Sequence, residues 1–402
     1  MKPATDAIEA ACVGEPLSKL SGLSNFQGES KGVVGIFDET VKKIQLFDLT
    51  AKTHIATLDT VEAKTEYKDH FVLYGEAGKY AVDITTQGIA IISADNVVVR
   101  DPITLVGKPI SAAFDSVLGH LVIYDDAGSV GLMQLDSNGR VLKSKVRGSR
   151  LNGSNGPTIS SGDLLADGNL VLSMNDGTIA LADFSQTING TVWSYATKVT
   201  GLPAAQWISR IPGQPSQVLM RIKGAGGHSV YIYDLQTQTV LSTYAITGFI
   251  EKSSRNGSPH LVLSPSDSNS YIVVYPVNGA LQIVQRTRYA TESVSTILSS
   301  RLSLTSDTFS YVETVKTGAT FDEEWNYNSF RENRTFNKFN LSEMLLQNKF
   351  SIPNGVLIEM SEDNLLALYP HRLGYAVSYD LDSPNGQLRN EFRFFNRKWL
   401  KK

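Results

Sequence analysis

The sequence has little of three features that would narrow its function: cysteine, an excess of one charge, and long apolar runs. With one cysteine, Cys12, the chain can form neither an internal disulfide nor a thiolate zinc cluster. Its 37 Lys and Arg residues are scattered and nearly balanced by 40 Asp and Glu residues, which argues against a nucleic-acid-binding surface. No window approaches about 18 consecutive apolar residues, so we expect no transmembrane segment.

The N-terminal residues leave two compartments open. Residues 8–16 (IEAACVGEP) have small residues before a cysteine, as lipoproteins do, but residues 1–7 lack the apolar core of a signal peptide. The chain is therefore either cytoplasmic or the mature part of an exported protein. Abundant Ser, Thr and Asn, with almost no cysteine, favour the periplasm or cell envelope of a bacterium, with membrane association through a partner or a lipid on Cys12.

From residue 32 onward the sequence consists of short apolar runs broken by turn residues. The runs are about five to eight residues long and rich in Val, Ile, Leu, Tyr and Thr, which is typical of β-strands. Several units share one plan of strand, turn, alternating strand ending near Asp, polar turn and outer strand: 42–58, 122–142, 170–193 and 229–246. Such self-similarity, at a period of roughly 40 to 50 residues, indicates the blades of a β-propeller.

Counting these units predicts an all-β fold, a single closed β-propeller of eight four-stranded blades. About six units follow residue 108, at 108–150, 155–202, 204–248, 249–292, 293–355 and 356–396. Residues 32–107 and one strand from the N-terminal arm supply two more. Seven blades is the alternative, because the run at 97–100 could lie outside any blade.

The domain boundaries follow from this count. We expect an N-terminal arm over 1–31, the propeller over 32–396 with an insertion at 316–349, and a basic tail over 397–402. The ring should close by pairing an N-terminal strand with strands around 387–395, since unpaired edges would otherwise remain. One helical turn is predicted at 341–348, capped by Asn340 or Ser342.

Units such as NLVLSMNDGTIALAD (169–183) and SVYIYDLQTQTVL (229–241) resemble the repeats of quinoprotein-type and YVTN-type β-propellers. The resemblance covers nearly the whole chain but concerns architecture alone. The Trp and Ala-Thr-Gly residues that dock quinone in such blades are not repeated, so no cofactor is expected. Through exported eight-bladed lipoproteins of outer-membrane assembly, the resemblance implies a cofactor-free scaffold.

Repeated polar residues at strand ends have a structural interpretation. An Asp that ends a strand accepts hydrogen bonds from the next turn, and we expect this role for six residues: Asp48, Asp83, Asp136, Asp183, Asp234 and Asp380. His120 and His260 each precede an apolar strand, which indicates a repeated structural position rather than a metal site. SMNDGT (173–178) is interpreted as a hairpin turn.

The insertion is the candidate interaction site. Within 316–349, aromatic and charged residues are dense, and Trp, Tyr and Arg are enriched in binding hot spots. The predicted partner-binding residues are Phe321, Asp322, Glu323, Glu324, Trp325, Tyr327, Phe330 and Arg331. The alternative is that these aromatics cap the propeller itself.

These observations favour a non-enzymatic scaffold that presents propeller-face loops to a protein partner, with no metal and no nucleic acid bound. The alternative is a propeller enzyme or glycan-binding protein with an axial site, which a metal would serve. The two differ in where polar residues converge: an axial site needs His, Asp or Glu side chains at the centre of the ring.

Overall fold

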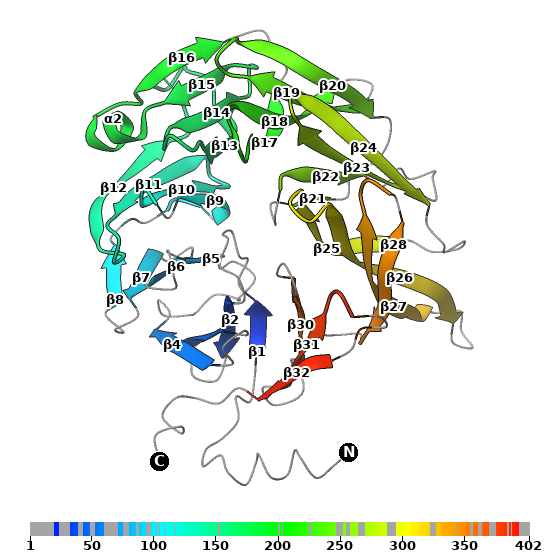
Figure 1. The fold of residues 1–402 in the computed structure, drawn as a ribbon. Helices are drawn as coiled ribbons and strands as arrows, with labels where there is room; N and C mark the ends of the chain where they lie inside the picture. Colours follow the sequence, from blue (N-terminus) through cyan, green and yellow to red (C-terminus); the bar gives the residue numbers. More distant parts are fainter. Residues whose placement is uncertain are drawn as a thin grey trace.

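Strands account for nearly all regular structure in the computed structural model of the chain (Figure 1). The structure describes elements between residues 20 and 393, and side chains chiefly between residues 103 and 386, with gaps in both ranges. Within these residues, four-stranded antiparallel sheets follow one another along the chain. Each is built from four consecutive strands, so we number the sheets in chain order.

The first four sheets contain β1 to β16. Sheet 1 comprises β1 (Leu20–Leu23), β2 (Val33–Asp38), β3 (Lys43–Asp48) and β4 (Thr53–Asp59). Sheet 2 comprises β5 (Phe71–Tyr74), β6 (Tyr80–Thr85), β7 (Gly88–Ser93) and β8 (Val98–Asp101). Sheet 3 comprises β9 (Pro109–Asp115), β10 (His120–Asp125), β11 (Ser129–Leu135) and β12 (Val141–Gly148). Sheet 4 comprises β13 (Ile159–Leu164), β14 (Leu170–Met174), β15 (Ile179–Ala182) and β16 (Tyr195–Val199), with helix α2 (Phe184–Asn189) before its last strand.

The last four sheets contain β17 to β32. Sheet 5 comprises β17 (Ala205–Ile211), β18 (Gln214–Gly224), β19 (Gly227–Asp234) and β20 (Thr239–Ile246). Sheet 6 comprises β21 (Lys252–Ser254), β22 (His260–Leu263), β23 (Ser270–Val277) and β24 (Ala280–Thr287). Sheet 7 comprises β25 (Ser295–Ser303), β26 (Thr308–Phe321), β27 (Tyr327–Asn340) and β28 (Leu346–Ile352). Sheet 8 comprises β29 (Leu357–Met360), β30 (Asn364–Tyr369), β31 (Tyr375–Asp380) and β32 (Leu388–Arg393).

The sheets lie side by side around a common centre, as blades do. Figure 1 shows first strands such as β9, β13 and β17 on the inside, and fourth strands such as β12, β16 and β20 at the periphery. Neighbouring sheets contact each other through β5 and β9, β13 and β17, β21 and β25, and β25 and β29. Strand β1 also contacts β29, which brings the first and last sheets together.

Each sheet has two ends, which differ in their connections. Because consecutive strands are antiparallel, the turns after the first and third strands lie at one end, here named the first end. The turn after the second strand and the connections between sheets lie at the other, the second end. The first ends of neighbouring sheets lie together: the Ser258 N–H donates to the Leu302 carbonyl at 2.9 Å, and His120 Nδ1 lies 3.2 Å from the Gly168 carbonyl.

The core lies between the sheets, which explains why second strands are apolar on both faces. All six residues of β10 are buried. Its Leu121 and Ile123 side chains pack in one cluster with Ile103, while Val122 and Tyr124 pack on the opposite face against sheet 4. Outer strands show the contrasting pattern, and β28 alternates exposed with buried residues. A strand covered on both faces reads as a continuous apolar run.

Polar side chains also join neighbouring sheets. The buried Arg147 guanidinium of β12 donates to the carbonyl oxygens of Thr187, Gly190 and Thr191 around the end of α2. A helix as short as α2 leaves its last carbonyl oxygens without intrahelical hydrogen bonds. The cationic guanidinium of Arg147 supplies the donors that they lack. Lys338 of β27 pairs with Asp382, which joins sheets 7 and 8 in the same way.

Two expectations need correction. The strand expected to close the ring at 387–395 is β32, which pairs with β31, while β1 pairs with β2, because every sheet uses only consecutive strands. Residues 341–348 form a turn and the start of β28 rather than helix, and Asn340 Oδ1 accepts the Glu343 N–H of that turn at 2.7 Å. The N-terminal arm of 1–31 contains β1, in keeping with the expectation that the arm supplies one strand to the first two units. The run at 97–100 overlaps β8, the fourth strand of sheet 2.

Among the described residues, no helix is long or apolar enough to span a membrane.

The predicted hairpin turn at 173–178 is confirmed and joins β14 to β15. Its Gly177 has a left-handed φ of 84°, and the Gly177 N–H donates to the Met174 carbonyl at 3.1 Å. A Cβ there would overlap the Leu202 carbonyl oxygen, so glycine is required by both conformation and space.

We expect Gly177→Ala to cost roughly 3 kcal/mol or more of unfolding free energy, because the Leu202 backbone would have to move. Gly153→Ala is the matched control: its φ is 86°, yet a Cβ there meets nothing within 4 Å. That control should lose about 1 kcal/mol of unfolding free energy, because only the cost of placing alanine in a left-handed conformation remains. Urea denaturation measures both, and equal losses would show that the Leu202 contact is unimportant.

Candidate functional site

The acids that end the third strands hold the turns that follow them. Asp136 Oδ1 accepts the N–H groups of Asn138 and Arg140, both at 2.9 Å. Asp234 Oδ1 accepts the N–H groups of Gln236 at 2.9 Å and Thr237 at 2.8 Å. The Thr237 hydrogen bond is the main cause that lowers the Asp234 pKa.

The same role recurs in two more sheets. Asp183 caps α2 by accepting the Gln186 N–H at 2.9 Å, and Asp380 accepts the Asp382 N–H at 2.9 Å. The predicted structural role is therefore confirmed for the four acids whose side chains are described. Asp48 ends β3, but its side chain lies outside the described residues. Asp83 was wrongly placed at a strand end, because it lies inside the second strand β6.

His120 and His260 occupy equivalent positions, as predicted. Each is the buried first residue of a second strand, in β10 and β22. The His120 ring stacks on Phe184 of sheet 4 at 3.9 Å between centroids, and the His260 ring meets Phe309 of sheet 7 edge-on at 5.5 Å. Each histidine therefore packs against the next sheet. Within the part of the chain that the structure describes, no group of three His, Cys, Asp or Glu residues is placed to hold a metal.

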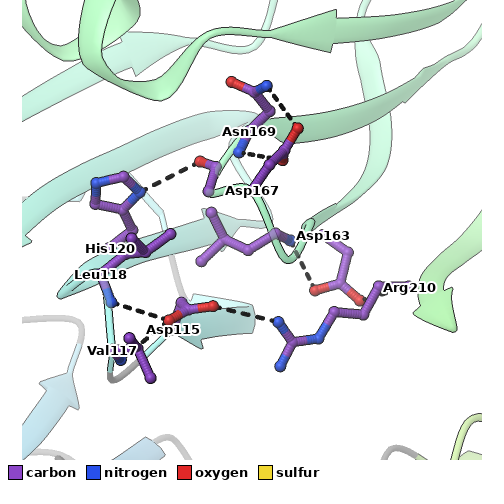
Figure 2. A network of polar contacts seen from close by, with 10 residues as sticks. Asp115, Val117, Leu118, His120, Asp163, Asp167, Asn169 and Arg210 are labelled. Atoms are coloured by element: carbon purple, nitrogen blue, oxygen red, sulfur yellow. Dashed lines mark hydrogen bonds and ion pairs between the residues drawn. The ribbon is translucent and has the colours of Figure 1, made fainter. Parts of the chain in front are cut away.

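A polar network at the inner strands joins three sheets (Figure 2). Asp115, which ends β9, accepts the N–H groups of Val117 and Leu118 through Oδ1, both at 3.0 Å. Its Oδ2 lies 3.5 Å from Arg210 Nη1 of β17. Between them, Asp163 of β13 accepts the Arg210 backbone N–H at 3.1 Å.

Among the described side chains, this network places polar groups on first strands that face the centre. It lies near the first end, where three neighbouring first strands face the centre. The Arg210 side chain is 41% exposed, whereas that of Asp115 is 12% exposed. The Arg210 guanidinium is therefore the more solvent-accessible member of its ion pair with Asp115, and both carboxylates are engaged with backbone N–H groups. Sequence reasoning missed these residues because the first strands share no repeated motif.

The predicted interaction segment does not form a loop inserted between strands. Instead it extends β26 and β27 to 14 residues each, so its backbone continues the ladder of sheet 7. Phe321 ends β26 and pairs directly with Tyr327, which begins β27. Phe330 and Arg331 follow within β27, opposite Ala319 and Thr317.

The side chains of these four residues, and all of Asp322, Glu323, Glu324 and Trp325, lie outside the described residues. As the turn after a second strand, the tip of this hairpin belongs to the second end. The structure thus brings Phe321 and Tyr327 together and leaves the binding role of the segment as a prediction.

Exposed apolar side chains mark the first end. Val117 and Leu118 lie in the β9–β10 turn with exposures of 83% and 38%. Leu304 and Leu345 lie in two adjacent turns of sheet 7, with exposures of 41% and 61%. These turns are joined where the Ser342 N–H donates to Asp307 at 3.2 Å. Two exposed leucines therefore lie in the turns at the first end of sheet 7.

Comparison with known proteins identifies the fold class. No protein-family model and no curated protein matches the chain. Among solved structures, dihydro-heme d1 dehydrogenase NirN in complex with DHE aligns over 95% of this chain and 77% of its own, with a TM-score of 0.58 and 12% identity. The C-terminal WD40 domain of Sif2 aligns over 95% and 88%, with a TM-score of 0.46 and 13% identity. The chain has the architecture of propeller-type proteins, and at these identities the likeness concerns the fold alone.

His260 should make stability depend on pH. Its Nδ1 lies 2.8 Å from the Ser258 carbonyl and its Nε2 lies 3.0 Å from Ser300 Oγ. Complete burial lowers the His260 pKa from 6.5 to about 4, so the imidazole is neutral when folded. Between these values the unfolded chain binds the proton and the folded chain does not, so stability falls as pH falls.

We expect the unfolding free energy to drop by about 3 kcal/mol between pH 6.5 and 4 through this residue, at ~1.4 kcal/mol per pKa unit. His260→Gln should flatten that slope in urea denaturation across the same range. His120→Gln should flatten it less, because the hydrogen bond to the Gly168 carbonyl and the charges of Asp115 and Asp183 oppose the lowering of the His120 pKa by burial. A wild-type slope retained in His260→Gln would refute the assignment.

Proposed function

We propose that this propeller is a non-enzymatic interaction scaffold of a bacterial cell envelope, and that it presents its second end to a protein partner. The observation that carries the proposal is the β26–β27 hairpin, whose 14-residue strands exceed every other strand of the chain that the structure describes. Extending both strands adds backbone pairing beyond the length of the other described strands. A hairpin of this kind is suited to contact another molecule, and its tip carries the aromatic residues.

The partner would bind Trp325 and its neighbours. The cross-strand pair of Phe321 and Tyr327 supports this, because it fixes two aromatic residues beside the tip. Trp325 would contribute a buried contact, while Asp322, Glu323 and Glu324 would set orientation and association rate. The connection at residues 152–156 and the β18–β19 tip belong to the same end, so they extend the same face.

We expect Trp325→Ala combined with Tyr327→Ala to abolish partner capture while the melting temperature stays nearly unchanged. The measurement is quantitative mass spectrometry of proteins cross-linked to the intact chain in native envelope extracts. Leu304→Ser combined with Leu345→Ser is the matched control, because it alters the same sheet at its first end.

The variants at the second end and at the first end of sheet 7 give distinguishable outcomes. Capture lost only with the Leu304 and Leu345 changes would move the docking site to the first end. Unfolding of the Trp325 and Tyr327 variant would show that these aromatics are core.

We also propose that the ring is closed and has eight blades. Support comes from the contact of β1 with β29 and from the eight consecutive four-stranded sheets found in the described elements. Sheets with two apolar faces are stable only when neighbours cover both, and a closed ring provides this for every sheet.

Deleting residues 1–23 tests closure, because it removes β1 from its contact with β29. In a closed ring, amide hydrogen exchange should accelerate in β30 and β31, at the far end of the sequence. Exchange in β14 and β15, on other sheets, is the internal control. Protection of β30 and β31 that is unchanged by the deletion would show that the last sheet does not depend on the first.

The envelope location rests on the scarcity of cysteine and the abundance of Ser, Thr and Asn. Membrane association would come from the partner or from a lipid on Cys12, and a cytoplasmic location is the alternative. Fractionation of cells that express the native gene separates the two.

A second candidate function is favoured by the axial network of Asp115, Asp163 and Arg210. Its exposed guanidinium would give an enzyme or glycan-binding protein a polar group at the centre of the ring. Elemental analysis and glycan-array binding of the purified chain discriminate: one metal per chain, or glycan binding lost in Arg210→Gln, would favour this function over the scaffold.

A further inference from the structure

Three basic side chains gather near the tip of the β18–β19 hairpin in sheet 5. Arg221 and Lys223 lie two residues apart on β18, and Lys223 pairs directly with His228 of β19. Residues two apart on a strand share a face, and so do directly opposed residues on neighbouring strands. All three side chains therefore project from the same face of the sheet.

That face is turned toward sheet 6. Arg221 pairs with Trp207 on one side and with Val230 on the other, and both belong to the apolar cluster shared with sheet 6. Arg221 and His228 are half-buried at the margin of this cluster, and Lys223 is exposed. The basic group therefore combines a partly desolvated floor with an open side.

Two of the nitrogen atoms are buried without a hydrogen-bond partner: Arg221 Nε and His228 Nδ1. Buried polar atoms in proteins almost always have partners, and a ligand that accepts hydrogen bonds would satisfy both of these atoms. The pKa shifts also indicate that positive charge is disfavoured at this place. Burial, followed by the charges of Arg221 and Lys223, lowers the pKa of His228, and burial lowers the pKa of Arg221.

Lys223 is exposed beside the tip, so solvent reaches this end of the basic face.

We propose that Arg221, Lys223 and His228 bind a tetrahedral oxyanion of the phosphate or sulfate type. Such an anion accepts hydrogen bonds on several oxygens at once, which suits a planar guanidinium, an ammonium and an imidazole projecting from one face. It would satisfy Arg221 Nε and His228 Nδ1 and neutralise the mutual repulsion. The assignment does not rest on the hairpin of sheet 7 or on any protein partner.

The test is calorimetric titration of the intact chain with inorganic phosphate, sulfate and acetate, with chloride added to hold ionic strength constant. We expect saturable binding of phosphate and sulfate at one site per chain. Arg221→Gln should weaken that binding at least tenfold, and Lys223→Gln, at an exposed position, should weaken it with no effect on folding. Arg140→Gln is the matched control, because Arg140 is an exposed cation in the β11–β12 turn at the first end.

Stability without anion gives a second readout. Because Arg221 carries an unpaired, partly buried charge, Arg221→Gln should melt at or above the wild-type temperature in chloride and should lose the stabilisation by sulfate. If Arg221 were a packing residue, the variant would melt lower and sulfate would act equally on both proteins. That result, or acetate binding as tightly as sulfate, overturns the proposal.

The pH dependence of sulfate binding isolates His228, since sulfate does not titrate in the range of imidazole. A bound anion favours the charged imidazole, so binding should tighten as pH falls through the ordinary histidine range. The groups that face His228 are Lys223 and Arg221 on β18 and the apolar Ile246 on β20. His228→Asn should abolish this pH dependence, and its persistence would exclude His228 from the site.

Discussion

The structure depends on one constraint: sheets 3 to 7 each have two apolar faces, and neither can be left in water. Strand β10 shows it directly, since Leu121 and Ile123 pack on one side while Val122 and Tyr124 pack on the other. A single sheet of this size cannot cover itself, so its neighbours supply the rest of the core. The inter-sheet polar contacts, such as that of Arg147 with the end of α2, form where the same packing brings sheet margins together.

This constraint also explains what could be predicted from the sequence. Turn chemistry is local, so the hairpin at Gly177 and the turn acids Asp136 and Asp234 were recognisable. Unit boundaries were recognisable too, because outer strands alternate. The position of a residue within its sheet could not be recognised from the sequence. Asp83 resembles the turn acids in sequence but lies inside β6. Residues 341–348 have helical spacing, yet the fourth strand of sheet 7 begins there, since the partner strand β27 is already in place.

The axial network was beyond sequence reasoning for a different reason. Asp115, Asp163 and Arg210 come from three units that are far apart in the chain, and only the arrangement around a centre brings them together. Their neighbours in sequence share no motif. The polar atoms of Arg221 and His228 were likewise beyond sequence reasoning, because their burial without a partner depends on how the hairpin packs.

The use of consecutive strands in every sheet has a consequence for how the chain may be cut. No strand pair joins one sheet to another, so a chain that began at β5 and ended at β4 would keep every pair. Circular permutation at any connection between sheets should therefore preserve the architecture. In the closed ring proposed above, no sheet would then be structurally first or last.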